Sequence, residues 1–314
     1  MKRIFLHQSF MAIVMLLLIA TACHNPMGVQ PLSETPTTGK IKISIDESFQ
    51  LLFDTQLYTF ESLYTNAKIT PLYKPELDVL ADLMNDSVRT IVLTRDLTKA
   101  EKDLLFSQKY VARTTKVAHD ALALIVNKDN PDSLLLDFQF ADILRGKITS
   151  WKQLNPKSKD LPINVVFDNN KSGNVRYFRD KFSIKGNFPS NCFAVNTNAE
   201  VINYVKENKS GLGIISVNWI SDTQDSVSEK FLKDVRIVEV GTDPLNYCKP
   251  YQGYIAEGSY PFIRDVFMIS RETFSGLGTG FASFVAGDQG QRIVLKSGLV
   301  PATMPIRLIE IKKD

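Results

Sequence analysis

The sequence is poor in residues that build metal centres and has little excess charge of either sign. Its 314 residues include three histidines, three cysteines and two tryptophans. So few histidines argue against a histidine-rich metal site, and we expect no metal or other cofactor. Lys and Arg number 37 against 34 Asp and Glu, a net charge of +3. The chain therefore lacks the basic excess of a nucleic-acid-binding protein.

Hydrolase motifs and short repeats are also missing. The chain has no Gly-x-Ser-x-Gly elbow and no His-Glu-x-x-His pair, which argues against a secreted hydrolase without excluding one. No repeat of fixed short period is visible. Hydrophobic residues make up 44% and charged residues 23%, values that exclude a disordered or collagen-like chain. The length predicts about two domains of roughly 100–200 residues.

The first residues predict a lipoprotein signal. Two basic residues are followed by the apolar run Phe10–Ala20, then by Thr21 and Ala22, and then by Cys23. A charged start, a short apolar core and small residues are typical of a secretory signal peptide. A cysteine at this point resembles a bacterial lipobox, which predicts cleavage after residue 22 and acylation of Cys23. A transmembrane anchor is the less favoured alternative, because a bilayer needs about 20 apolar residues.

The next segment, residues 23–39, contains three prolines and two glycines without a periodic pattern. Such a composition predicts a flexible tether between the lipid and the folded body. The protein is then expected in the periplasm or cell envelope, anchored to a bacterial membrane, where disulfides are permitted. Cys192 and Cys248 could pair there or remain as buried free thiols. A catalytic pair of a cysteine with His119 is less favoured.

Short apolar runs and amphipathic stretches alternate from Lys40 onward. Residues 41–45 alternate apolar and polar side chains as a strand does, whereas apolar residues between 49 and 64 recur at helical spacing. Further strands are predicted at 69–73, 90–93, within 111–127, and at 163–167, 212–216, 235–240 and 265–270. Further helices are predicted at 76–84, after Thr98, and at 138–144, 175–182, 198–206, 279–285 and 289–296. This alternation predicts an α/β fold with mostly parallel sheets covered on both faces.

Two of these helices begin with capping boxes. Thr98 precedes Glu101 by three residues, and Thr197 precedes Glu200 by the same spacing. In such a box the threonine hydroxyl accepts from the first turn and the glutamate reaches back.

Three loops follow predicted strands at the edge where open α/β sheets bind ligands. They begin near Asp46, Thr94 and Asn169. Amides at a helix start lack partners and lie at the positive end of the dipole, so they can hold small anions. The third loop is the most specific, because Ser172-Gly173-Asn174 lets the backbone approach a ligand and Arg176 can add charge. The alternative is that the serines are only N-caps and the arginines only solvated charges.

A series of motifs extends over about residues 40–305. It comprises Asp120–Asn127 with Asn130-Pro131, the segment Ile143–Leu154, Ser172–Asn174, Gly211–Ile215, Tyr260–Arg264 and Gly290–Pro301. In content and order the series resembles the PstS-like phosphate-binding proteins, the substrate-binding lipoproteins of phosphate ABC transporters.

The resemblance implies a type II periplasmic-binding-protein fold, with two α/β lobes joined by crossing hinge strands around a ligand cleft. Residues 40–119 and 252–314 would form the first lobe, and residues 120–251 the second. The chain would cross near Ala118–Ala123 and return near Tyr251–Ile255. The hinge would let the lobes close over an anion, as in other clamshell receptors.

The resemblance also implies ligand-binding positions. Ser48 and Phe49 would contribute from the first loop, and Ser172, Gly173 and Asn174 from the second lobe. Further expected ligand-binding residues are Thr94, Arg95, Asp168 and Arg176.

Two positions depart from the family pattern. The family has Ser-Asp-x-Pro-Leu where this chain has Thr94-Arg95-Asp96-Leu97, and Arg where this chain has Asp168. Our hypothesis is that Arg95 supplies the cation and Asp168 the carboxylate, exchanged between loops. A carboxylate accepts the proton of hydrogen phosphate and repels sulfate, which has none. Asp46, Glu47 or Asp96 could take that role instead.

The expected function is therefore capture of inorganic phosphate or a similar oxyanion for an ABC transporter permease, by a monomer without enzyme activity. Two alternatives stay open: a lipid-anchored sensor or scaffold that keeps the receptor fold without import, and a secreted hydrolase. His119 is expected to be structural, with a ligand contact near the hinge as the alternative.

Overall fold

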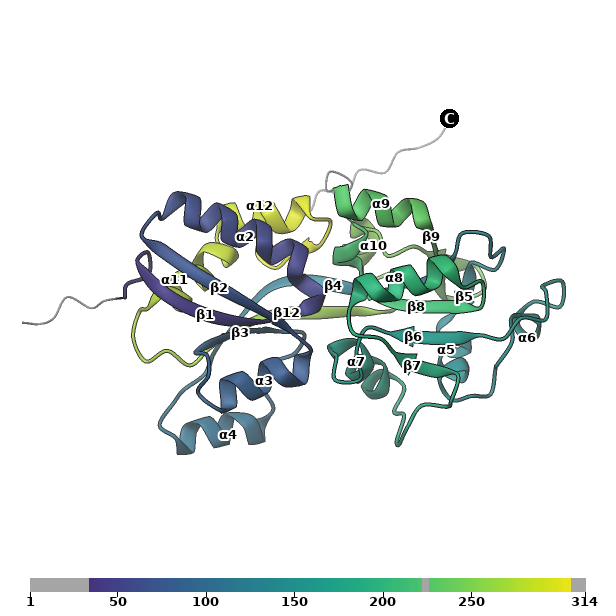
Figure 1. Cartoon of the computed structure of the whole chain (residues 1–314), viewed down its shortest axis with the longest axis horizontal. Helices are drawn as coiled ribbons and strands as arrows, with labels where there is room; N and C mark the ends of the chain where they lie inside the picture. The colour runs from purple at the N-terminus through teal and green to yellow at the C-terminus, as the bar shows by residue number, and fades with distance from the viewer. Residues whose placement is uncertain (1–33, 222–225, 306–314) are drawn as a thin grey trace, which may run out of the picture. The chain divides into compact units, whose positions relative to one another are not determined.

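The computed structural model describes residues 34–221 and 226–305. The predicted signal peptide at 1–22, the lipidation site Cys23 and most of the predicted tether lie outside the described residues. In the described part, two groups of elements, which we call the first and second lobes, are joined by two long strands (Figure 1).

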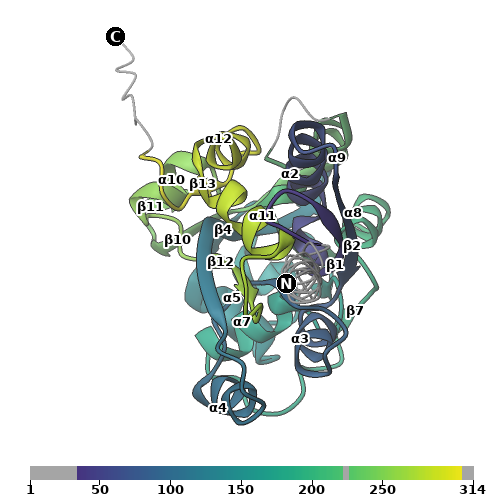
Figure 2. The same cartoon turned by 90° about the vertical axis from the view of Figure 1, so that its left-hand side faces the viewer.

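The first lobe combines the early part of the body with its last helices. Its elements are β1 (Gly39–Asp46), the 3-10 turn η1 (Glu47–Phe49), α2 (Gln50–Leu63), β2 (Ala67–Lys74), α3 (Glu76–Met84), β3 (Thr90–Leu93), α4 (Lys99–Ser107), α11 (Leu277–Ala286) and α12 (Asp288–Lys296). Strand β3 shows why both sheet faces are covered: Val92 packs with α2 and α11, whereas Ile91 and Leu93 pack with α3 and α4. The helices accordingly lie on opposite sides of the sheet (Figure 2).

The second lobe contains the middle of the chain. Its elements are β5 (Leu134–Leu136), α5 (Asp137–Leu144), α6 (Trp151–Leu154), β6 (Asn164–Phe167), α7 (Gly173–Lys181), β7 (Cys192–Ala194), α8 (Asn198–Glu207), β8 (Gly211–Ser216), η2 (Val217–Trp219), α9 (Ser226–Asp234), β9 (Val235–Ile237), β10 (Glu239–Asp243), β11 (Asn246–Cys248) and α10 (Gln252–Glu257). A cluster of aromatic rings fills its core, including Phe140, Phe178 and Phe262.

The strands β4 (Arg113–Asn127) and β12 (Ile263–Ser270) connect the lobes. They pair antiparallel from Arg113 with Ser270 to Ala121 with Ile263. The region 111–127, predicted as one or two strands, is one strand that pairs with β12 in one part and with β8 in the other. The short strand β13 (Val300–Pro301) also pairs with β4.

The main sheet is mixed. In the described residues its strand order is β2-β1-β3-β12-β4-β8-β6-β7, with β9 and β13 also paired to β4. The strands β1, β2 and β3 run parallel, as do β6, β7 and β8, but β12 and β4 make only antiparallel pairs. The prediction of mostly parallel sheets is therefore wrong at the centre, because one strand leaves the first lobe and the other returns to it. A second sheet has the order β11-β10-β5.

Some local predictions need correction. The predicted strand at 235–240 is two strands, β9 paired with β4 and β10 paired with β5. The first capping box is complete, since Glu101 accepts from the amide of Thr98. The second is one-sided, because Glu200 accepts from the amide of Asn196 instead of from that of Thr197.

The lobe boundaries stay a prediction. The described residues belong to one compact unit. Ile255, Tyr260 and Phe262 lie in the part predicted for the first lobe but pack in the second-lobe core. In the structure, the long returning strand between the lobes is β12.

The cysteines and the lone histidine of the described chain have structural positions. Cys192 and Cys248 are both free thiols, which decides the alternative that the sequence left open. His119 lies in β4, and its Nδ1 is 2.7 Å from Asp265 Oδ1 in the neighbouring strand β12. Lys116 Nζ is 2.7 Å from the other oxygen of the same carboxylate. These contacts support the structural interpretation of His119.

Candidate functional site

The two lobes meet along a seam, where the loops that end β1, β2 and β3 contact the starts of α7, α8 and η2. The amide of Leu77 donates to the carbonyl oxygen of Lys171 across the seam, at 3.1 Å. Lys171 Nζ lies 3.0 Å from Asp78 Oδ1. Asn218 Nδ2 donates to the carbonyl oxygen of Ser48 at 3.1 Å. The carboxyl ends of the first-lobe strands therefore face the second lobe, as expected for a ligand site in an α/β sheet.

The start of α7 contributes a capped helix end to the seam. The Ser172 hydroxyl accepts from the amide of Val175 at 3.3 Å, as an N-cap does. It also donates to Asp168 Oδ1 at 2.7 Å. Ser172 and Asp168 are both buried. Both hydrogen bonds of the Ser172 hydroxyl, to the Val175 amide and to the Asp168 carboxylate, are therefore shielded from water.

Gly173, the first residue of α7, permits a close approach of the lobes. A Cβ at this position would lie 2.7 Å from Thr94 Oγ1, 2.8 Å from Glu76 Oε2 and 3.0 Å from Asp46 Oδ2. Real Cβ atoms essentially never lie closer than 3.0 Å to another heavy atom, so these side-chain ends would have to move. The helix start and the first-lobe polar groups can touch only because glycine has no side chain.

We expect Gly173→Ala to lower the free energy of unfolding by about 1–3 kcal/mol, because the new methyl group overpacks the seam. Alanine in a helix is otherwise more favourable than glycine by roughly 0.5–1 kcal/mol, so the two effects have opposite signs. Urea unfolding followed by circular dichroism measures the balance. A variant as stable as the parent or more stable would show that the seam is not this tightly packed.

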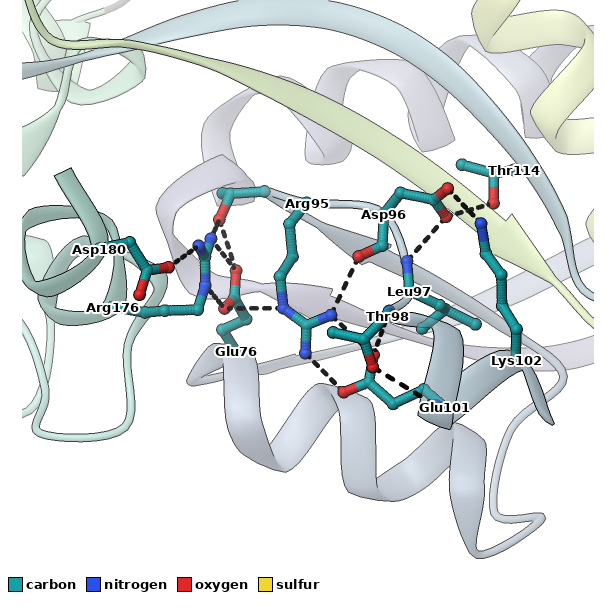
Figure 3. A network of polar contacts seen from close by, with 11 residues as sticks. Glu76, Arg95, Asp96, Leu97, Thr98, Glu101, Lys102, Thr114, Arg176 and Asp180 are labelled. Carbon is teal, nitrogen blue, oxygen red and sulfur yellow. Dashed lines mark hydrogen bonds and ion pairs between the residues drawn. The ribbon is translucent and has the colours of Figure 1, made fainter. Parts of the chain in front are cut away.

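Glu76, the first residue of α3, lies between two guanidinium groups (Figure 3). Its carboxylate accepts from the Thr94 hydroxyl and from Nε of Arg176, and Arg176 Nη2 lies 3.1 Å from Oε2. Arg95 Nε is 3.9 Å from Oε1. The residue is 1% exposed. Burial alone would raise the pKa of Glu76, but the hydrogen bonds and charge of Arg176 outweigh it and hold the pKa below its usual value.

Arg95 is engaged mainly within the first lobe. Its Nη1 and Nη2 each lie 2.7 Å from an oxygen of Glu101, and Nη1 also donates to the carbonyl oxygen of Asp96 at 2.9 Å. The guanidinium thus reaches the edge of the site but is held there by a two-point ion pair. The exchange of roles between Arg95 and Asp168 stays a prediction.

Three further carboxyl groups lie in the seam. Burial is the main cause that raises the pKa of Asp46 to about 7, that of Glu47 to about 8 and that of Asp168 to about 6. Asn198 Nδ2 donates to Glu47 Oε2 at 2.5 Å and approaches Asp168 Oδ2 at 3.5 Å. The charge of Glu76 further raises the pKa of Asp46. The site therefore carries more acid than base, and part of that acid holds protons near neutral pH.

Arg264 in β12 is the buried cation that the sequence analysis missed. Its Nε donates to Asp120 Oδ2 at 2.8 Å, and its Nη1 donates to Asn174 Oδ1 at 2.7 Å. The guanidinium carbon lies 5.5 Å from the centre of the Phe49 ring, a cation–π contact. Ser216 completes the environment of Asp120 by donating to Oδ1 at 2.9 Å.

Five buried polar atoms near this group have no hydrogen-bond partner among the described residues. They are Asp46 Oδ2, Ser48 Oγ, Asn174 Nδ2, Asn218 Oδ1 and Arg264 Nη2. Buried polar groups in proteins are normally paired. Donors and acceptors left over together on both sides of a seam are typical of a site that receives polar atoms from a solute.

The structure brings most of the predicted residues into the seam. Arg95 lies at the edge of the seam. The other predicted ligand-binding residues contact one another or share the partners described above; they are Ser48, Phe49, Thr94, Asp168, Ser172, Gly173, Asn174 and Arg176. Functional candidates that the sequence analysis missed are Glu76, Asp120, Asn198, Asn218 and Arg264. Glu76 had a usable signal, because it follows a predicted strand just as the three chosen loops do.

The described residues contain no group of three or more His, Cys, Asp or Glu side chains placed to hold a metal ion. None of the described helices has both the length and the apolar character to cross a bilayer.

Comparison with known proteins identifies the family of this chain. A sequence profile of the PBP superfamily domain matches residues 31–289, most of the chain. The chain belongs to the PBP superfamily.

Relatives of this PBP superfamily chain include phosphate-binding proteins PstS. The protein of Staphylococcus epidermidis is 28% identical over 202 residues, which make up 63% of this chain and 59% of the relative. The protein of Staphylococcus aureus strain USA300 gives the same figures. The chain thus aligns with 59% of the length of these relatives.

Solved structures show the same fold. A Clostridium perfringens protein with bound phosphate matches with a TM-score of 0.73 at 23% identity, over 84% of this chain and 100% of that chain. An ABC-type phosphate transport receptor from Vibrio cholerae matches with a TM-score of 0.64 at 20% identity, over the same shares. The predicted type II fold, with two α/β lobes joined by crossing strands, is confirmed.

Proposed function

We propose that this protein is a receptor that binds inorganic phosphate, or a closely similar oxyanion, and delivers it to an ABC transporter permease. Its place would be the periplasm or cell envelope, held to a membrane by a lipid on Cys23. The bound anion would contact both lobes at the seam, so that binding and lobe closure occur together.

The observation that carries this proposal is the convergence at the start of α7. Thr94 approaches from the first lobe, and Ser172, Asn174 and Arg176 belong to the second. Ser48 contributes from the first lobe at the same seam, where it contacts Asn218 of η2. Hydroxyl groups, a guanidinium and a capped helix start are the groups that bind oxyanions in proteins. The relatives support the same ligand, since they are named as phosphate-binding proteins and phosphate transport receptors rather than as enzymes.

The acidic character of the seam bears on the choice of anion. Asp168, whose pKa of about 6 leaves its carboxyl group mainly charged at neutral pH, can accept a hydrogen bond from a protonated ligand oxygen, and sulfate has no proton to give. Sulfate would instead place an unprotonated oxygen against the Asp168 carboxylate. The site is therefore expected to select a protonated oxyanion.

Calorimetric titration of the full chain in detergent tests the function. We expect saturable heat at one site with phosphate, and binding of sulfate weaker by at least about tenfold because its oxygens repel the Asp168 carboxylate. Nitrate serves as a control for nonspecific anion effects. Absence of heat with both phosphate and sulfate would overturn the proposal and favour a sensor or scaffold that keeps the receptor fold.

A further inference from the structure

The strongest unexplained feature of the seam is the carboxylate of Glu76. It is bound by the Thr94 hydroxyl and by two nitrogens of Arg176, and its Oε2 lies 2.8 Å from where a Cβ of Gly173 would be. These are the contacts that the proposed function assigns to an oxyanion. A side chain of the protein therefore stands in the position of the ligand.

We propose that Glu76 is an internal competitor of the anion. Its carboxylate occupies the cradle formed by Thr94, Arg176 and the start of α7, and it must leave when an anion enters. The proposal rests on the proposed function for the nature of the solute.

Position in the fold favours this role. Glu76 belongs to the first lobe, whereas Arg176 and Gly173 belong to the second, so the carboxylate joins the lobes just as an anion would. Pro75, the N-cap residue of α3, makes no side-chain hydrogen bond, and the Glu76 carboxylate accepts from Thr94 and Arg176. The side chain can therefore bind groups of the opposite lobe.

The residues that follow Glu76 extend the same connection. The amide of Leu77 donates to the carbonyl oxygen of Lys171, and the Asp78 carboxylate pairs with the Lys171 ammonium. The first turn of α3 is thus fastened to the loop before α7 through Leu77 and Asp78, and to α7 itself through Glu76. With Glu76 in the cradle, the seam is closed without solute, and anion entry requires this turn to detach.

Charge balance makes the competition effective. Arg176 has a second acidic partner, Asp180, whose carboxylate lies 3.1 Å from Nη1 and is exposed. The Nε edge of the Arg176 guanidinium is directed to Glu76 (Figure 3). The Thr94 hydroxyl donates to the same carboxylate. An entering anion would exchange one charged partner for another at this edge, and Glu76 would regain hydration. The free energy needed to separate Glu76 from Thr94 and Arg176 therefore reduces the free energy gained when the anion binds.

The test uses Glu76→Gln, which keeps the shape of the side chain and removes its charge. Hydrogen exchange at the Leu77 amide reports closure of the seam without solute, and calorimetry with inorganic phosphate reports affinity. We expect faster exchange at Leu77 in the variant and phosphate binding tighter by about tenfold, because the anion no longer displaces a charged partner. Phosphate should slow the exchange in both proteins.

Asp180→Asn is the matched control, because it removes the other carboxylate of the same guanidinium and leaves the cradle intact. Its phosphate affinity should stay within about twofold of the parent, as for an exposed ion pair. If the parent binds phosphate but Glu76→Gln binds it equally well or more weakly, the internal competitor is refuted and the proposed function stands. If neither protein binds phosphate while exchange at Leu77 still rises, the proposed function fails and the closing role of Glu76 stands.

Discussion

Replacing Arg264 with methionine is expected to lower the free energy of unfolding by about 3–5 kcal/mol, the largest single effect foreseen for this protein. Asp120, its ion-pair partner, is 0% exposed and lies in the strand that joins the lobes. Burial raises the pKa of Asp120, and the charge and hydrogen bond of Arg264 oppose that rise. Without the guanidinium, the carboxyl group must stay charged and unpaired or take up a proton.

The measurement is urea unfolding of the full chain at neutral pH. Arg292→Met is the control, because Arg292 forms an exposed ion pair with Asp288 one turn away in α12, and such a pair contributes at most about 0.5 kcal/mol. Adding Asp120→Asn to Arg264→Met should recover part of the loss by removing the unpaired charge. A loss below about 1 kcal/mol in Arg264→Met would mean that the pair does not secure the crossing strands.

Much of the fold could be predicted from local patterns. Strand 41–45 and the helix from 49 to 64 correspond to β1 and α2, because their apolar spacing matches the sheet face and the helix stripe that become buried. The direction of β12 relative to β4 could not be predicted. It depends on the chain returning between the lobes after more than a hundred residues, and no local spacing carries that information.

The site divides in the same way. Ser172 and Gly173 could be found because a strand end followed by a helix start is a local feature. Arg264 was quoted only as part of a motif, since its importance depends on Asp120, 144 positions away. An arginine on the inward face of a strand needs a buried partner, and sequence spacing alone does not show which carboxylate that partner is.

Raising the pH from 5 to 8 is expected to destabilise the closed, folded protein. Asp46, Glu47 and Asp168 have folded-state pKa values of about 7, 8 and 6, whereas carboxyl groups in unfolded chains titrate near pH 4. Between these values the folded state keeps protons that the unfolded state has released. Their contribution to stability is therefore complete below about pH 4 and is lost as the pH rises through 6 to 8. Glu76 has a lowered pKa, so its opposite effect falls below this range.

The free energy of unfolding measured in urea should fall by several kcal/mol between pH 5 and pH 8, because each proton that only the folded state holds is worth about 1.4 kcal/mol per pH unit. The double variant Asp46→Asn with Glu47→Gln copies the protonated forms of two of the three groups, so it should lose less than half as much over the same range. Asp103→Asn, an exposed substitution in α4, should keep the slope of the parent. A stability that is constant or rises from pH 5 to pH 8 would contradict the assignment of protons to the seam. The acid-rich seam would then be charged in the folded state, and Arg176 and Arg264 would have to balance it without help from protons.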